Sequence, residues 1–226
     1  MLDFFKFQLT EFHKRVLTTI FGLGILFLFG YFELIDLLAA IIYIILYSEL
    51  LIVCYESKAQ IHKRVLVFIV GMVYLFLAAI AFPDNYFSTQ EPVYDAMNCL
   101  FAVFAIDTSA YIFGKLLKGP KLMPKVSPNK TISGFIFGTI AGTISFHYFI
   151  SSMIFDDAVF HIYIGILFAF VAQAGDLLVS YAKRVCKVKH SSFLLPGHGG
   201  LWDRFDSICA AMIFIYILQL FFIGNA

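Results

Sequence analysis

The residues best suited to chemistry gather between Ser180 and Asp206, a polar, glycine-rich stretch with apolar segments on both sides. Within it, Asp203 and Asp206 are three residues apart, so on a helix they share one face and are suited to holding a divalent cation. Charged groups beside long apolar segments are costly to place, which favours a functional interpretation. The charges that pair with phosphate are Lys183, Arg184 and Arg204. The stretch therefore predicts a site that combines a metal cation with phosphate.

The middle of this stretch reads Pro196-Gly197-His198-Gly199-Gly200. Glycines at this density suggest backbone that approaches a ligand closely. His198, flanked by glycines, is a candidate for orienting or contacting a phosphate group. Asp176 follows a glycine near the end of an apolar run, where it is well placed as a second metal ligand. These residues extend the predicted site to the N-terminal side of Asp203 and Asp206.

A second polar segment, Ser127-Pro128-Asn129-Lys130-Thr131, precedes another apolar run. One interpretation is a phosphate clamp, in which a rigid proline turn presents hydroxyl groups and Lys130 supplies a cation. The simpler interpretation is a helix entry with Thr131 as the N-cap. By itself the segment does not decide between them.

Simpler interpretations also exist for the charges of the main stretch. A single acid in the first turn of a helix complements the helix dipole, and Lys183 with Arg184 could anchor a helix end at a membrane surface. Two acids that follow His-Gly-Gly and enclose Arg204 favour a site instead.

The elements that must position these residues are membrane helices. The 226 residues are 61% hydrophobic, include 28 Phe and are only 14% charged, which is typical of an integral membrane protein. Near-continuous apolar runs select helices rather than a β-barrel. We therefore expect an all-α, polytopic membrane protein, a single domain over residues 1–226, with about seven transmembrane helices. The expected spans are Val16–Tyr31, Leu37–Val53, Val65–Phe82, Ala96–Phe113, Gly134–Ile154, Phe160–Val179 and Ser207–Ile223.

The basic residues are segregated among the connections between these spans. All 16 Lys and Arg fall in the N-terminal tail or in three connections, Lys58–Arg64, Lys115–Lys130 and Lys183–Arg204. The positive-inside rule then places the N-terminus and the polar stretches in the cytoplasm and the C-terminus outside, as an odd number of spans requires. In a bacterial cell this would be the inner membrane.

Together these residues resemble the phosphatidate cytidylyltransferase (CDP-diacylglycerol synthase) family of membrane enzymes. The family signature runs from a Ser followed by Lys-Arg to Leu-Pro-Gly-His-Gly-Gly and Asp-Arg-x-Asp. Its counterparts in this chain are Ser180, Lys183-Arg184, Lys189, Leu195–Gly200 and Asp203–Asp206. Further matches are Asp107–Tyr111, Gly114-Lys115, Ser127–Thr131 with Gly134, and Gly175-Asp176. The resemblance covers residues 107–207, which we take as the catalytic portion.

The resemblance implies transfer of CMP from CTP to phosphatidic acid, which yields CDP-diacylglycerol and pyrophosphate in phospholipid synthesis. It implies Mg²⁺, with Mn²⁺ as an alternative, held by Asp176, Asp203 and Asp206. The catalytic residues would be Asp203, Asp176 and Lys130, and the substrate-binding residues Ser127, Lys183, Arg184, His198, Arg204 and Asp107. We expect CTP, phosphatidic acid and the bilayer as partners and no nucleic acid, and the sequence leaves a homodimer open.

Three of the acids that are usual in the family pattern are absent from this chain. Ser133, Val179 and His190 stand where the family usually has an acid. Two alternatives therefore remain at this stage: a CTP-dependent polyprenol or lipid kinase, which would accept an alcohol, and a catalytically degenerate membrane partner protein.

Overall fold

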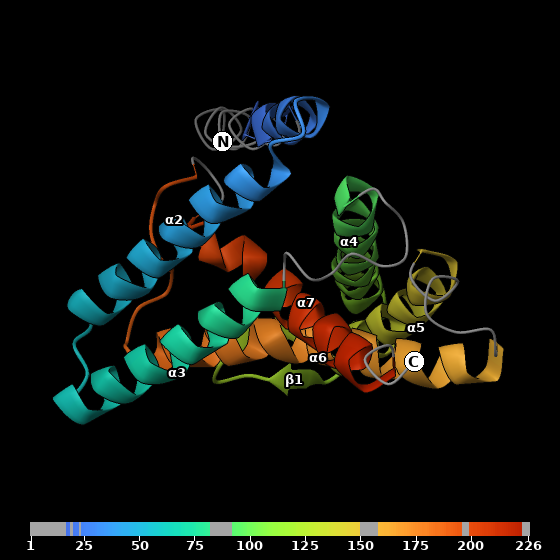
Figure 1. Ribbon diagram of the computed structural model, residues 1–226. Helices are drawn as coiled ribbons and strands as arrows, with labels where there is room; N and C mark the ends of the chain where they lie inside the picture. The colour runs from blue at the N-terminus through green and yellow to red at the C-terminus, as the bar shows by residue number, and fades with distance from the viewer. Residues whose placement is uncertain are drawn as a thin grey trace, which may run out of the picture.

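The computed structural model describes residues 17–18, 20–22, 24–81, 92–149, 158–195 and 199–222. The fold is a bundle of long helices with one small hairpin beside it (Figure 1). In chain order the elements are α2 (Ile35–Tyr55), α3 (Ile61–Ala81), α4 (Pro92–Leu117), β1 (Lys121–Met123), β2 (Ser127–Thr131), α5 (Ile132–Phe149), α6 (Ala158–Val185) and α7 (Trp202–Phe222). A shorter apolar helix, Ile20–Tyr31, precedes them.

The predicted all-α membrane architecture is confirmed. Within the described residues, α2, α3, α4, α6 and α7 each contain a segment long and apolar enough to cross a bilayer. The other two predicted spans correspond to the shorter helix Ile20–Tyr31 and to α5, and the expected fifth span runs on into residues outside the described part. The count of seven therefore stays a prediction.

The outer surface of the bundle is apolar. Ile44 on α2, Phe104 on α4 and Tyr163 on α6 are each more than 60% exposed. Side chains of this kind face lipid in a membrane protein, where the helices satisfy their own backbone hydrogen bonds. The polar residues of the predicted site must then face the interior.

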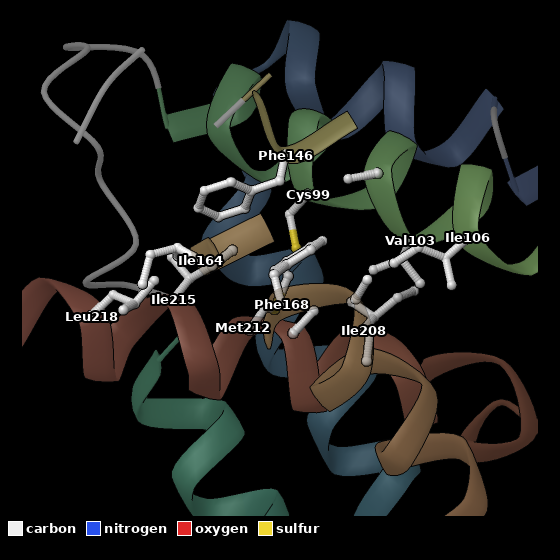
Figure 2. Close-up of a cluster of buried hydrophobic side chains, with 14 of the residues drawn as sticks. Cys99, Val103, Ile106, Phe146, Ile164, Phe168, Ile208, Met212, Ile215 and Leu218 are labelled. Carbon is white, nitrogen blue, oxygen red and sulfur yellow. The ribbon is translucent and has the colours of Figure 1, made fainter. Parts of the chain in front are cut away.

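One apolar core joins the second half of the chain. α4 packs against α5, α5 against α6, and α6 against α7. At the centre of this core, the rings of Phe146 and Phe168 lie 5.3 Å apart, surrounded by buried apolar residues from α4, α6 and α7 (Figure 2). Because lipid is as apolar as these side chains, close packing rather than hydrophobic burial holds the helices together.

A second core attaches α2 and α3 to α6 and α7. Leu46 and Leu50 of α2 and Leu75 of α3 are fully buried against Val179 of α6 and Trp202 of α7. The N-terminal helices, which carry no motif of the predicted site, thus pack directly on the two helices that carry most of it.

The hairpin corrects the interpretation of the Ser127–Thr131 segment. This segment is strand β2, paired antiparallel with β1 so that Thr131 lies opposite Lys121, and the predicted proline turn is wrong. The predicted N-cap is confirmed, because the Thr131 hydroxyl accepts a hydrogen bond from the Gly134 N–H at 3.1 Å, in the first turn of α5.

Candidate functional site

A cavity of about 720 Å³ opens between α4, the hairpin, α5, α6 and α7. Four carboxylates line it, although they come from three helices and are up to 99 residues apart in sequence: Asp107, Asp176, Asp203 and Asp206. Lys130 of β2 and Arg204 of α7 line the same cavity. The structure thus brings together six of the ten predicted site residues.

Lys130 and Asp176 form an ion pair at the cavity wall. The Lys130 Nζ atom lies 2.5 Å from Asp176 Oδ2, and each side chain is about one quarter exposed. The other oxygen of Asp176 accepts a hydrogen bond from the Ser180 hydroxyl at 3.2 Å, one turn further along α6. Strand β2 carries Lys130 to this position, which explains why the segment is extended rather than a turn. A partly exposed pair can exchange partners when an anion enters.

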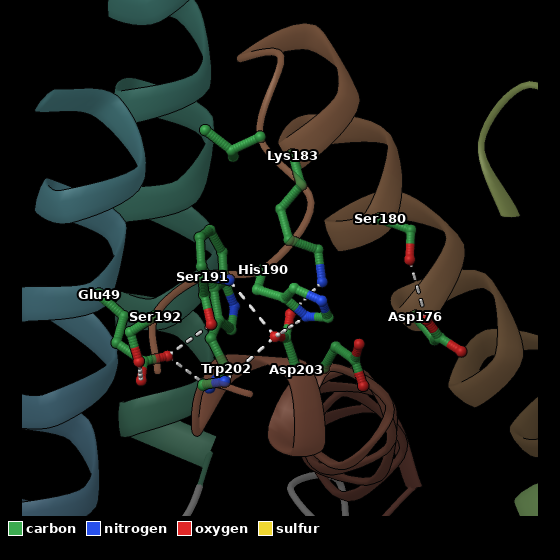
Figure 3. A network of polar contacts seen from close by, with 12 residues as sticks. Glu49, Asp176, Ser180, Lys183, His190, Ser191, Ser192, Trp202 and Asp203 are labelled. Atoms are coloured by element: carbon green, nitrogen blue, oxygen red, sulfur yellow. Dashed lines mark hydrogen bonds and ion pairs between the residues drawn. The ribbon is translucent and has the colours of Figure 1, made fainter. Parts of the chain in front are cut away.

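Asp203 has a more enclosed environment (Figure 3). Its Oδ1 pairs with the Lys183 ammonium, with the two side chains only 10% and 7% exposed. Its Oδ2 accepts hydrogen bonds from the N–H groups of Ser191 at 3.3 Å and Gly200 at 3.2 Å, and the His190 ring nitrogen lies 3.5 Å away. Lys183, which the sequence predicts to bind substrate, is therefore paired with Asp203, which the sequence predicts to be a metal ligand.

Asp206 is buried at the back of the cavity, where α7 meets α3 and α6. Its backbone carbonyl accepts a hydrogen bond from the Tyr74 hydroxyl at 2.6 Å, and its Oδ1 accepts one from the Ser207 N–H at 2.8 Å. Gly175 on α6 allows this approach, because a Cβ there would lie 2.4 Å from Ala210 Cβ and 2.9 Å from the Asp206 carbonyl. The close contact of α6 and α7 sets the spacing between their carboxylates.

Besides Lys183, which is paired with Asp203, three predicted residues are not found among the described residues that line the cavity. Ser127, at the far end of β2, is not among the lining residues. Arg184 donates hydrogen bonds to the carbonyls of Val126 and Val188 at 3.2 and 3.0 Å, so it fastens the hairpin to the end of α6. His198 lies outside the described residues, so its predicted role stays a prediction.

The sequence-based prediction missed two groups of residues. Lys115, Lys118 and Lys121 line the cavity from the end of α4 and from β1; the clustering of basic residues in that connection was the available signal, although it equally marks the cytoplasmic side. Glu49, in the middle of α2, accepts hydrogen bonds from the segment that leads into α7. Its signal was a carboxylate inside an apolar run.

The residues that depart from the family pattern have identifiable surroundings. Val179 packs in the core that joins α2 and α3 to α7. The Ser133 hydroxyl lies 3.2 Å from the Thr131 hydroxyl, and His190 is next to Asp203. All three therefore lie close to elements of the site.

The donor set suits a magnesium ion that is shared with substrate. Mg²⁺ is usually bound through one or two carboxylates together with waters and substrate phosphates. Asp107, Asp176 and Asp206 present such oxygens to a single cavity. In the part of the chain that the structure describes, no three ligating side chains are grouped around one point. The residues thus fit a metal that arrives with a phosphate ligand, rather than a preformed cage.

Comparisons with known proteins show the family to which this chain is related. A sequence profile of the cytidylyltransferase family matches residues 2–222. A protein named phosphatidate cytidylyltransferase from Rickettsia typhi is 37% identical over 163 residues, 69% of this chain and 69% of that protein. Proteins of the same name from Rickettsia conorii and Bacillus subtilis are 37% and 35% identical, over 53% and 68% of this chain. The chain spans only 55% of the length of each of these last two relatives.

Proposed function

This chain belongs to the cytidylyltransferase family, and we propose that it is a phosphatidate cytidylyltransferase, which transfers CMP from CTP to phosphatidic acid. The observation that carries the proposal is the cavity between α4, the hairpin, α5, α6 and α7, where carboxylates and cations alternate inside an otherwise apolar helix bundle. The relatives share the name of this activity.

In the proposed reaction, a phosphate oxygen of phosphatidic acid attacks the α-phosphorus of CTP. The new P–O bond joins the lipid phosphate to CMP, the bond between the α-phosphorus and the bridging oxygen breaks, and pyrophosphate leaves with that electron pair. The attacking phosphate is already largely ionised at neutral pH, so the reaction needs no strong general base. The main difficulty is that two polyanions must approach each other, which fixed positive charge can relieve.

The cations of the cavity are placed for this task. Lys130 and Arg204 face the same space as the four carboxylates, and Lys115, Lys118 and Lys121 extend the positive charge along one wall. We assign the triphosphate of CTP to this wall, because several lysines on two elements match a group with several charges. The phosphate of the lipid would then lie nearer Arg204, at the α6–α7 side.

The proposed metal ion is Mg²⁺, or Mn²⁺ in its place, held by Asp176, Asp203 and Asp206. When bound, it withdraws charge from the attacked phosphate and stabilises the leaving pyrophosphate. Metal binding by Asp176 would rearrange the ion pair between Lys130 and Asp176, because Lys130 is the present partner of that carboxylate.

The finer assignments of partner and location also belong to this proposal. We propose phosphatidic acid as the lipid acceptor, with its acyl chains in the bilayer; the exposed apolar side chains of the helices support this arrangement. We place the site on the cytoplasmic face of the cell inner membrane, with the N-terminus inside and the C-terminus outside, because the basic connections gather on one side. A homodimer stays open.

The test is to follow the two ends of CTP separately. The purified protein, in detergent with phosphatidic acid and Mg²⁺, is given CTP labelled at either the α- or the γ-phosphate. We expect the α-label to enter the lipid fraction and the γ-label to leave as pyrophosphate. Transfer of the γ-label to an added polyprenol or lipid alcohol would identify a kinase instead, and no transfer of either label would indicate a degenerate partner protein.

A further inference from the structure

Glu49 is a buried carboxylate in the middle of the membrane-spanning helix α2. It is 1% exposed and accepts four hydrogen bonds from outside its own helix (Figure 3). Its Oε1 accepts from the Ser192 hydroxyl at 2.5 Å and the Leu201 N–H at 2.8 Å. Its Oε2 accepts from the Ser191 hydroxyl at 2.8 Å and the Trp202 N–H at 2.7 Å. A carboxylate offers about four lone-pair directions, and all four are used here.

Two of these donors are the backbone N–H groups at the start of α7. The first N–H groups of a helix have no partner within the helix, and negative charge next to them is favoured by the helix dipole. Capping groups usually come from the residue that precedes the helix. Here the cap comes from a residue about 150 positions upstream, so it joins α2 to the beginning of the helix that carries Asp203 and Arg204.

The other two donors tie the preceding segment to the same carboxylate. The Ser191 hydroxyl binds Glu49, while the Ser191 N–H binds Asp203. Gly200 lies between the two acids: its N–H donates to Asp203, and a Cβ on it would lie 1.9 Å from the Ser191 hydroxyl and 2.7 Å from Glu49 Oε2. Glu49 and Asp203 therefore hold the same backbone from opposite sides.

We infer that Glu49 is a positioning residue of the active site: it fixes the start of α7 so that Arg204 and Asp206 reach the cavity in register with Asp176 and Lys130. The inference rests on the proposed function for its catalytic consequence, although the hydrogen-bond geometry is independent of it. It also gives α2, which carries no residue of the cavity wall, an indirect part in the reaction through the start of α7. Tyr74 of α3, bound to the Asp206 carbonyl, supports the same turn of α7.

Glu49→Gln is the sharpest perturbation, because it keeps the shape and removes one acceptor atom. Each carboxylate oxygen accepts one backbone N–H, so either orientation of the amide points its NH₂ group at the N–H of Leu201 or Trp202. The clash of two donors should release the start of α7. We expect kcat with CTP and phosphatidic acid to fall about 100-fold, the loss associated with a misplacement of about 1 Å. KM for CTP should change little, because Glu49 touches neither the hairpin nor the end of α4.

The second readout does not depend on activity. Hydrogen–deuterium exchange in detergent should be about tenfold faster at the amides of Leu201 and Trp202 in Glu49→Gln than in the wild type. The matched control is Ser48→Ala: Ser48 is the neighbouring residue, is exposed, and its hydroxyl donates a hydrogen bond to the Ile45 carbonyl of its own helix at 2.7 Å. Its exchange and kcat should stay at wild-type values.

The two readouts separate the outcomes. If the wild-type protein transfers no label from CTP, the proposed function is wrong, while the exchange comparison still tests the role of Glu49. Unchanged exchange in Glu49→Gln overturns the inference, and so does faster exchange with unchanged kcat, which would leave Glu49 structural only. If Glu49→Gln fails to insert, Ser191→Ala with Ser192→Ala removes two of the four donors more gently. Wild-type kcat and exchange in that double variant would equally overturn the inference.

Discussion

Asp203→Asn should destabilise the protein by about 3–5 kcal/mol, the cost of removing one partner from a buried ion pair. The sequence alone suggested about 1 kcal/mol, the value of an acid in a first helical turn. The difference comes from Lys183, whose ammonium is 7% exposed and pairs with Asp203. Asparagine nearly preserves the shape but leaves that charge buried without its counter-charge.

The measurement is equilibrium unfolding in mixed micelles, with Asp36→Asn as the control. Asp36 is also an acid in the first turn of a membrane helix, α2, but it is exposed, so its replacement should cost at most about 1 kcal/mol. The double variant Lys183→Met with Asp203→Asn removes both charges and should recover much of the lost stability. A coupling energy of up to about 3 kcal/mol is expected between contacting residues of this kind. Equal losses in Asp203→Asn and Asp36→Asn, or no coupling, would refute the argument from the buried pair.

The same double variant separates the two roles of Asp203. If Asp203 is a metal ligand, restoring stability should not restore cytidylyl transfer, because an amide oxygen carries no formal charge and binds Mg²⁺ poorly. We expect this result, with any residual activity requiring more Mg²⁺ for saturation. Turnover that returns together with stability would make Asp203 a purely structural carboxylate. The metal would then depend on Asp176 and Asp206.

Two further predictions test the phosphate contacts and the topology. Lys130→Ala should lower turnover by about 100-fold or more, with little loss of stability because its ion pair is partly exposed. The control Lys58→Ala, in the exposed link between α2 and α3, should leave turnover unchanged. Equal losses of turnover in the two variants would show that Lys130 is only a membrane anchor. A cysteine introduced at Asp156 should react with an impermeant thiol reagent in intact cells and one at Lys121 should not; external labelling at Lys121 would reverse the proposed orientation.

The helices could be predicted from the sequence because each rule involved is local. Apolar runs of about 20 residues mark spans in any sequence, and the start of α7 next to Asp203 follows from first-turn preferences. The Thr131 cap is local as well, since donor and acceptor are three residues apart. The resemblance to a known family added the identity of the motif residues but no distances between them.

The features that the sequence did not reveal are contacts between distant elements. Strand β2 is five residues long, contains Pro128 and lacks an alternating pattern, so only its pairing with β1 defines it. The Lys183–Asp203 pair joins residues that no helical spacing relates. The four partners of Glu49 lie 142 to 153 residues away. The sequence showed only that a carboxylate in an apolar run must have partners, not which they are.

The architecture makes α6 the reference element of the site. Its polar residues Gln173, Asp176, Ser180 and Lys183 recur at spacings of three and four, so they form one polar face along the second half of the helix. Asp176 on this face holds Lys130 of the hairpin, and Lys183 holds Asp203 of α7. A helix in lipid can keep such a face only by covering it with protein or with a polar cavity. The face therefore needs α7 at a fixed depth and rotation, which the close contact at Gly175 alone does not set. Glu49 of α2, which caps the start of α7, and Tyr74 of α3, which binds the Asp206 carbonyl, supply that constraint. For this physical reason, a site built from the second half of the chain depends on helices in the first half.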